Sequence, residues 1–345
     1  MNYENRLDYF ENNYEIIFGA NFNETLQLDD RTDNQELKKC RFCKAVENDG
    51  IHTFNKEAHA ISRCLGNKKI VSTYECDDCN SNFGMTIEND LSSFFSVARA
   101  LFPIEGRKPS YTLCTKNPNE FIKNDIRKKH ITIQSGIDSG TVQVDELNKT
   151  LTLTQESQSF KPYEVYRAFC KIFLTLIPLK YLDEAIHANI ALNPESLNEF
   201  CARFGMVPSE FQLNIDMMAR AHKLFIPGPS LSDAQIFRSK SGLANHPNFI
   251  FIIRIANYAY EFHYFDINKI ITNAKKENPG ENKAKLDLNC ESLLKVIYTS
   301  LLNNIDQEKI GTPKITLESF QGRKAITNKA PITFGFHSME KKTHK

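Results

Sequence analysis

The sequence predicts an α+β fold, with a small N-terminal module followed by a larger mixed α/β C-terminal domain. Two Cys-x-x-Cys pairs near the N-terminus enclose two segments of strand character, and a helical pattern follows the second pair. The rest of the chain changes between strand and helix patterns without an internal repeat. With 345 residues, the chain exceeds the usual size of one domain, so we expect more than one.

Changes in composition divide the chain into four segments. Residues 1–37 are polar and acidic and are expected to form an N-terminal arm and linker, and residues 38–102 hold the paired cysteines. Residues 103–325 are predicted to form a mixed α+β domain whose role is recognition, sensing or oligomerisation. Residues 326–345 are basic and poor in pattern, so we expect a mobile tail.

Composition and charge exclude some classes of protein. The chain is 41% hydrophobic and 25% charged, which is typical of a globular protein. Its 43 basic and 42 acidic residues give a net charge of +1, so a nucleic-acid partner would need a local basic face. The N-terminus lacks a signal-peptide pattern, and no apolar stretch approaches the ~18 residues that span a bilayer. We therefore expect a cytoplasmic protein with no membrane partner.

Two strands and a helix are predicted within the cysteine module. Residues 52–61 alternate between apolar and polar side chains, which indicates a strand, and residues 69–75 form a second candidate strand. From Asn80 onward, apolar residues recur at helical spacing until Pro103 ends the helix. The predicted order is therefore cysteine pair, strand, loop, strand, cysteine pair and helix.

The C-terminal region carries patterns for both element types. One helix, over residues 163–177, is apolar on all sides and is expected to be buried. The alternation of Tyr258, Tyr260, Phe262 and Tyr264 is more typical of a buried strand face than of a base-stacking platform. Four histidines show no metal-ligand spacing: His187, His222, His246 and His263. The other predicted elements are a basic loop over 104–130, a β-meander over 131–153, helices near 183–205 and 291–305, and strands over 231–238 and 248–265.

Four cysteines in two tight pairs are the most informative feature of the chain. Cys40 and Cys43 form the first pair, and Cys76 and Cys79 form the second. Each pair can direct two thiolates to one point, so two pairs complete a closed tetrahedral site. The other five of the nine cysteines show no pairing rhythm, which fits a reducing compartment. We therefore predict that the four cysteines bind a structural Zn²⁺ ion.

Polar residues enclosed by the cysteine pairs have the types needed to hold a second metal. On a strand, Glu57 and His59 share a face, and zinc would bring Asn80 at the helix start against that strand. Glu57 and Asn80 would then hold one hard divalent cation, Mg²⁺ or Mn²⁺, with open positions. A neutral His59 could deprotonate a water for attack on a phosphodiester. Taken singly, His59 could be a structural hydrogen bonder and Asn80 a helix cap.

The chain resembles the HNH endonuclease family in its zinc-knuckle ββα-metal, treble-clef-like form. The resemblance covers about residues 38–95 and implies a metal-dependent endonuclease that hydrolyses DNA. It is specific because four sub-motifs occur in order. They are Cys40-x-x-Cys43, Glu57-Ala58-His59-Ala60-Ile61, Leu65-Gly66-Asn67-Lys68 and Glu75-Cys76-x-x-Cys79-Asn80-x-x-Phe83-Gly84.

The resemblance implies a role for each motif residue. His59 occupies the position of the general base, Asn67 that of an asparagine that pins the loop backbone, and Asn80 that of a metal ligand. The family usually has a metal-binding residue directly before the base, where this chain has Ala58. Glu57, one residue earlier, is therefore assigned that role.

Other residues near the motif are interpreted from their position. Arg63, Lys68 and Lys69 lie in the loop between the two predicted strands, where they could bind phosphates or simply be solvated. Glu88, two helical turns after Asn80, is interpreted as a solvated residue rather than a brace of the site.

Three functions are considered as alternatives. The leading one is a metal-dependent endonuclease acting on DNA, with RNA less favoured, in the manner of a bacterial defence or phage-related effector. The second is a zinc-ribbon protein that binds nucleic acid without catalysis. The third is a nuclease-derived scaffold, or a nuclease that is inactive until a ligand or a protein partner binds the C-terminal domain. The C-terminal domain could also form a homo-oligomer.

Overall fold

The structure is a computed structural model with a mixed α+β fold, as the sequence predicts. The predicted helix near 291–305 and the chain after residue 335 lie largely outside the described residues. The structure describes residues 3–31, 37–114, 119–135, 142–193, 195–205, 207–208, 218–226, 230–240, 246–269, 271–272, 292–294, 296 and 315–335.

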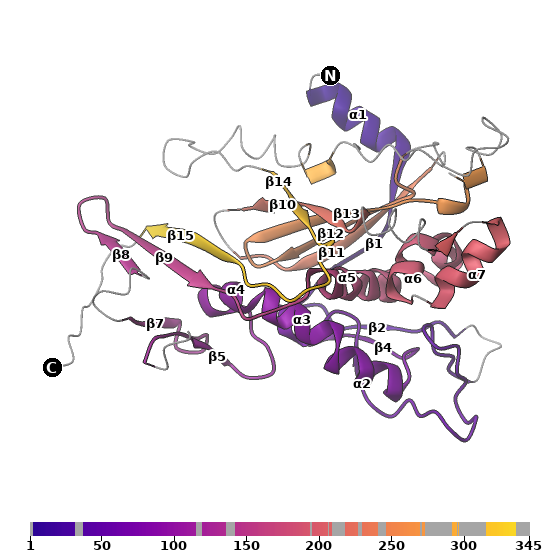
Figure 1. The fold of residues 1–345 in the computed structure, drawn as a ribbon, viewed down its shortest axis with the longest axis horizontal. Coiled ribbons are helices and arrows are strands. Elements are labelled where there is room, and N and C mark those ends of the chain that lie inside the picture. The colour runs from indigo at the N-terminus through magenta and orange to yellow at the C-terminus, as the bar shows by residue number, and fades with distance from the viewer. Residues whose placement is uncertain are drawn as a thin grey trace.

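A six-stranded antiparallel sheet forms the centre of the molecule (Figure 1). Its strand order is β1-β11-β12-β13-β10-β14. The apolar run of β12 is buried on both faces because the sheet is covered on both sides. The strands are β1 (Tyr14–Asn21), β10 (Arg220–Phe225), β11 (Asp233–Ser239), β12 (Phe249–Ile255), β13 (Tyr258–Tyr264) and β14 (Thr316–Ser319).

Helices cover both faces of this sheet. The helix α5 (Pro162–Leu176) lies against one face, where Phe169 and Phe173 contact aromatic rings of β12 and β13. The helix α1 (Tyr3–Asn13) lies on the other face, with Phe10 in one apolar cluster with residues of β12. The aromatic stripe on β13 is packed against α5, so it belongs to the core rather than to a stacking platform.

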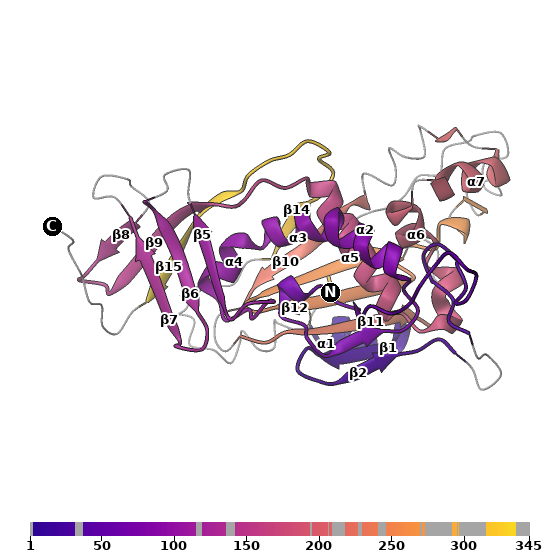
Figure 2. The ribbon, with the colours of Figure 1, turned by 90° about the horizontal axis from the view of Figure 1, so that it is seen from below.

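Three smaller sheets have three strands each. Figure 2 shows two of them, β5-β6-β7 and β15-β9-β8, at the end of the molecule opposite α6 and α7. In the third, β4 pairs parallel with β2 and antiparallel with β3. The strands are β2 (Leu26–Leu28), β3 (Ala58–His59), β4 (Ile70–Ser72), β5 (Ser110–Cys114), β6 (Phe121–Asp125), β7 (His130–Gln134), β8 (Val142–Asp145), β9 (Thr150–Glu156) and β15 (Lys329–Gly335).

The helix predicted between Asn80 and Pro103 is divided into three. The divisions fall at Thr86 and Phe95, whose backbone angles leave the helical region. The three helices are α2 (Asp77–Met85), α3 (Ile87–Phe94) and α4 (Ser96–Leu101). Other helices within the described residues are α6 (Ile186–Leu192), α7 (Glu195–Phe204) and the short 3₁₀ helices Arg63–Leu65 and Leu179–Glu184.

Several sequence predictions differ from the structure. Residues 104–130 contain β5 and β6, so the prediction of a loop is wrong. The alternation of β6 is hard to recognise in the sequence because one of its buried positions is Asn124, whose side chain donates a hydrogen bond to the Phe102 carbonyl. The strand expected over 52–61 is reduced to β3, and the one over 69–75 to β4. Within the expected arm, β1 joins the central sheet, and within the expected tail, β15 pairs with β9.

The cysteine module and the region after it share one apolar cluster. The cluster includes Ile61 and Leu91 of the module, Phe169 of α5, and Phe251 and Phe262 of the central sheet. Among pairs of helices, α3 and α5 make the most extensive contact with each other. Within the described part of the chain, no helix is long and apolar enough to cross a lipid bilayer.

Candidate metal centre and active site

The two cysteine pairs come together in the structure. The sulfur atoms of Cys40, Cys43, Cys76 and Cys79 all lie within 4.8 Å of one another, and those of Cys43 and Cys76 are 3.6 Å apart. Four sulfurs around one zinc ion at 2.3 Å are separated by about 3.8 Å. The spacing and the donor type therefore fit a structural zinc ion held by the four cysteines.

The titration of these thiols also fits a cation at their centre. A hydrogen bond with Cys79 lowers the pKa of Cys40 to about 4, whereas burial raises the pKa of Cys76 to about 12. The same hydrogen bond raises the pKa of Cys79. Because adjacent thiolates repel one another, all four can ionise together only when a metal ion compensates their charge.

The backbone around the cysteines follows from the local sequence. After the first pair, Lys44 has a positive φ of 64°, and its amide donates to the Cys40 carbonyl at 3.0 Å. Cys76 is the residue before α2, and its amide donates to Cys40 Sγ at 3.5 Å. The Asp77 carboxylate then accepts hydrogen bonds from the amides of Asn55 and Lys56. These bonds fix the loop that leads into β3 against the start of α2.

Arg41, which lies inside the first cysteine pair, joins the metal centre to α5. Its guanidinium donates to the carbonyls of Leu174 and Ile177 at the end of α5, at 2.5 and 2.8 Å. It also makes two hydrogen bonds of 2.6 Å with the Asp30 carboxylate and lies over the Tyr74 ring. A cation at this end compensates the helix dipole and satisfies carbonyls that lack partners within the helix.

His59 lies on β3 with a largely buried imidazole. Its Nε2 is 3.4 Å from the Glu57 carboxylate, whose side chain is 65% exposed. Its Nδ1 is buried, and no described side chain or backbone group forms a hydrogen bond with it. Burial and the nearby positive charge of Arg63 lower the pKa of His59, while Glu57 opposes the shift. The imidazole is therefore neutral at physiological pH and able to accept a proton.

Asn67 is fully buried and holds the loop between β3 and β4 together. Its side-chain amide donates to the carbonyls of Ile61 and Ile70 at 2.7 and 2.9 Å. Its side-chain oxygen accepts from the amides of Lys69 and Ile70 at 3.2 and 2.9 Å. These four bonds connect the chain just after His59 to the chain entering β4.

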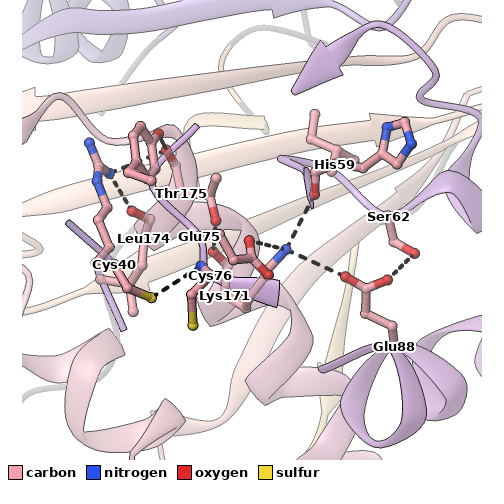
Figure 3. Close-up of polar contacts among 12 residues, drawn as sticks. Cys40, His59, Ser62, Glu75, Cys76, Glu88, Lys171, Leu174 and Thr175 are labelled. Carbon is pink, nitrogen blue, oxygen red and sulfur yellow. Dashed lines mark hydrogen bonds and ion pairs between the residues drawn. The ribbon is translucent and has the colours of Figure 1, made fainter. Parts of the chain in front are cut away.

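A buried ionic network lies behind His59 (Figure 3). Lys171 of α5 places its ammonium 3.0 Å from Glu75 and 3.5 Å from Glu88, and donates to the His59 carbonyl at 3.2 Å. Glu88 also accepts a 2.9 Å hydrogen bond from Ser62. Burial alone would lower the pKa of Lys171, but the two carboxylates raise it, so the lysine stays charged. Glu88 is thus a brace of the site, and its interpretation as a solvated residue is wrong.

The remaining predicted site residues lie in the same module. Asn80 is in the first turn of α2, directly after Cys79, and is partly buried. Arg63 and Lys69 are exposed on the loop between β3 and β4. The Lys68 ammonium is engaged by Glu105 at 2.7 Å. Arg63 and Lys69 therefore remain the two basic side chains of this loop that are best placed to receive a phosphate.

Lys171 and Glu75 were missed in the sequence. A signal was present, because Lys171 is the one charged residue in the otherwise apolar stretch 168–177. A lysine on the buried face of a helix needs an acidic partner, but the sequence does not say which one. Only the fold brings α5 against the cysteine module.

Comparison with protein-family models, with curated proteins and with solved structures finds no match for the chain. What the site can do therefore has to be inferred from its own side chains.

Proposed function

We propose that the chain is a metal-dependent endonuclease of the HNH type, which hydrolyses DNA phosphodiester bonds with His59 as general base. The observation that carries the proposal is the environment of His59. The largely buried, neutral imidazole is 3.4 Å from the Glu57 carboxylate and is influenced by the positive charge of Arg63. A base beside a carboxylate that can bind a metal and a cation that can bind phosphate is one combination that can hydrolyse a phosphodiester.

The surrounding side chains support this chemistry by fixing the base. Lys171 holds the His59 carbonyl, and Asn67 ties the following chain to β4. Glu57 and Asn80 would supply side-chain oxygen atoms, the ligands that Mg²⁺ or Mn²⁺ prefers. A divalent cation bound there would stabilise negative charge on the scissile phosphate. Arg63 and Lys69 would hold the neighbouring phosphates of the strand.

Plasmid cleavage tests the proposal. The full-length chain, loaded with Zn²⁺, is expected to nick or cut plasmid DNA with Mg²⁺ or Mn²⁺. Replacing a general base costs on the order of 10²- to 10⁴-fold in rate, so His59→Ala should lower cleavage at least a hundredfold. His52→Ala is the matched control, because His52 lies in the same module and its imidazole pairs with Asp49 at 2.7 Å. Zinc content is measured in each variant to show that the module is intact.

Two outcomes would contradict the proposal. Equal cleavage by the His59→Ala variant would remove His59 from the mechanism. DNA binding by the wild type without cleavage under any divalent cation would favour the non-catalytic zinc-binding alternative instead.

A further inference from the structure

Three metal-ligand side chains meet on the face of the six-stranded sheet that is turned away from α5. They are His222 of β10 and Glu261 and His263 of β13, and their ligand atoms lie within 4.8 Å of one another. The histidines show no ligand spacing in the sequence, yet the fold brings two of them to one point. The separation by one residue between Glu261 and His263 was the only local signal.

The strand register makes this arrangement a property of the backbone. His222 is directly opposite Glu261 in the antiparallel pairing of β10 with β13. Directly opposed residues share a face, and so do residues two apart on one strand, such as Glu261 and His263. All three side chains must therefore project from the same side of the sheet.

Glu261 is held as a fully buried carboxylate. It accepts hydrogen bonds from the amides of Leu293 and Leu294, at 3.0 and 2.6 Å, and from the Ser292 hydroxyl at 2.9 Å. His263 Nε2 lies 2.5 Å from one carboxylate oxygen, and His222 Nδ1 lies 3.8 Å from the same oxygen. This oxygen therefore faces two imidazole nitrogens at once, and a buried negative charge requires a compensating positive one.

The space beside the three side chains is small. A cavity of about 10 Å³ is lined by the cluster together with Met218, Arg220, Phe265 and Leu317. A volume of this size accommodates about one water molecule. The site is therefore large enough for a single ion and too small for an organic substrate.

We propose that His222, Glu261 and His263 bind one divalent first-row transition-metal ion, with Zn²⁺ as the probe ion. Two imidazole nitrogens and one carboxylate oxygen are a donor set that such ions prefer, and they leave one coordination position for a water. The ion compensates the buried Glu261 carboxylate and links β10 to β13 and to residues 292–294. The site is separate from the cysteine centre and from His59, which contact α5 on the opposite face of the sheet through Arg41 and Lys171.

The zinc content of the full-length chain tests this site. Zn²⁺-saturated protein is passed through gel filtration, and its zinc is measured by elemental analysis and by X-ray absorption at the zinc edge. The variants His222→Gln and His263→Gln should each lose one zinc equivalent, together with nitrogen scattering from histidine. His130→Gln, at an exposed histidine of β7, is the matched control and should lose none.

The proposal is overturned if the wild type and both variants bind the same amount of zinc per chain and give the same X-ray absorption spectrum at the zinc edge. Circular dichroism shows whether each variant is folded. If one variant fails to fold, the other variant decides by the same comparison. If both fail, absorption by the wild type decides, because zinc bound only by sulfur would exclude the site.

Discussion

The side chain of Lys171 is 1% exposed, and its ammonium group faces the carboxylate of Glu75, which is itself fully buried. Removing both charges from water costs several kcal/mol per ion, and only their attraction and their remaining hydrogen bonds offset that cost. Glu88 and the His59 carbonyl supply those further contacts. The position of the candidate base therefore depends on a charge that comes from a different part of the chain.

Replacing Lys171 with methionine is expected to destabilise the protein by about 3–5 kcal/mol, because Glu75 is left as an unpaired buried charge. Urea unfolding measures the change. The double variant with Glu75→Gln should recover part of the loss, since both charges are then removed together. Lys108→Met, at an exposed lysine, is the control and should change stability by less than about 0.5 kcal/mol. A loss in the double variant equal to the sum of the two single losses would contradict this pairing.

At the scale of elements, α6 is fixed to the core through His187. This histidine is fully buried, with Nε2 at 3.3 Å from the Tyr166 hydroxyl of α5. Its Nδ1 accepts a 3.4 Å hydrogen bond from the amide of Phe265, just after β13. Burial lowers the pKa of His187 to about 3, so the folded protein holds it neutral. Protonation of this buried imidazole is therefore unfavourable in the folded protein.

The pH dependence of stability follows from this shift. Between the unfolded pKa of about 6.5 and the folded pKa of about 3, the unfolded chain binds a proton that the folded chain does not. The contribution of His187 to the free energy of unfolding is therefore complete above pH 6.5. It is lost as the pH falls, and the loss is about 3 kcal/mol at pH 4. In His187→Gln, the free energy of unfolding should fall less steeply between pH 7 and pH 4.

Urea titrations at several pH values measure this slope. His130→Gln, at an exposed histidine, serves as the control and should retain the steeper dependence of the wild type. Identical slopes for the wild type and His187→Gln would show that His187 does not carry the effect.

The elements that could be predicted are those whose burial is evident from runs of apolar residues in the sequence. The apolar run of β12 is uninterrupted over residues 249–253, and that of α5 is broken over residues 168–177 only by Lys171 and Thr175, because both elements are largely buried. Strands β5 and β6 were missed because their sheet is small and half exposed, and because β6 buries Asn124 where a pattern would require an apolar residue. The break at Thr86 falls at an exposed residue whose hydroxyl donates to the Asn82 carbonyl at 2.6 Å.

The candidate site was predictable only in its local part. The cysteine spacing identified the cluster of four cysteines that could hold a metal ion, and the spacing of Glu57 and His59 placed these two residues together. Lys171 and the cluster around Glu261 could not be found, because their partners meet through strand register and helix packing between distant segments. Those contacts are products of the fold rather than of local spacing.

On the scale of the whole molecule, one apolar cluster runs from the cysteine module through α5 to the central sheet. Arg41 and the Lys171 network add polar contacts across the same boundary. Cooperative unfolding is expected when elements share one core in this way, because neither part can lose its packing alone.

Removing the structural metal should therefore destabilise more than the module. A strong zinc chelator, or the Cys79→Ser variant, is expected to lower the melting temperature of the entire chain in a single transition, because metal-binding free energy contributes to folding. Calorimetry and the near-ultraviolet signal of the tyrosines should report the same midpoint. Two separate transitions, with the core melting as in the metal-loaded protein, would show that the module folds independently.

The contact of Arg41 with the end of α5 has a consequence for protein engineering. If residues 38–102 were transferred to another protein without α5, Arg41 would lose the carbonyls that it binds at the end of that helix. Glu75 would at the same time lose its ion pair with Lys171. The nuclease module proposed for this chain is therefore not transferable on its own, and a chimera would need α5 as part of the insert.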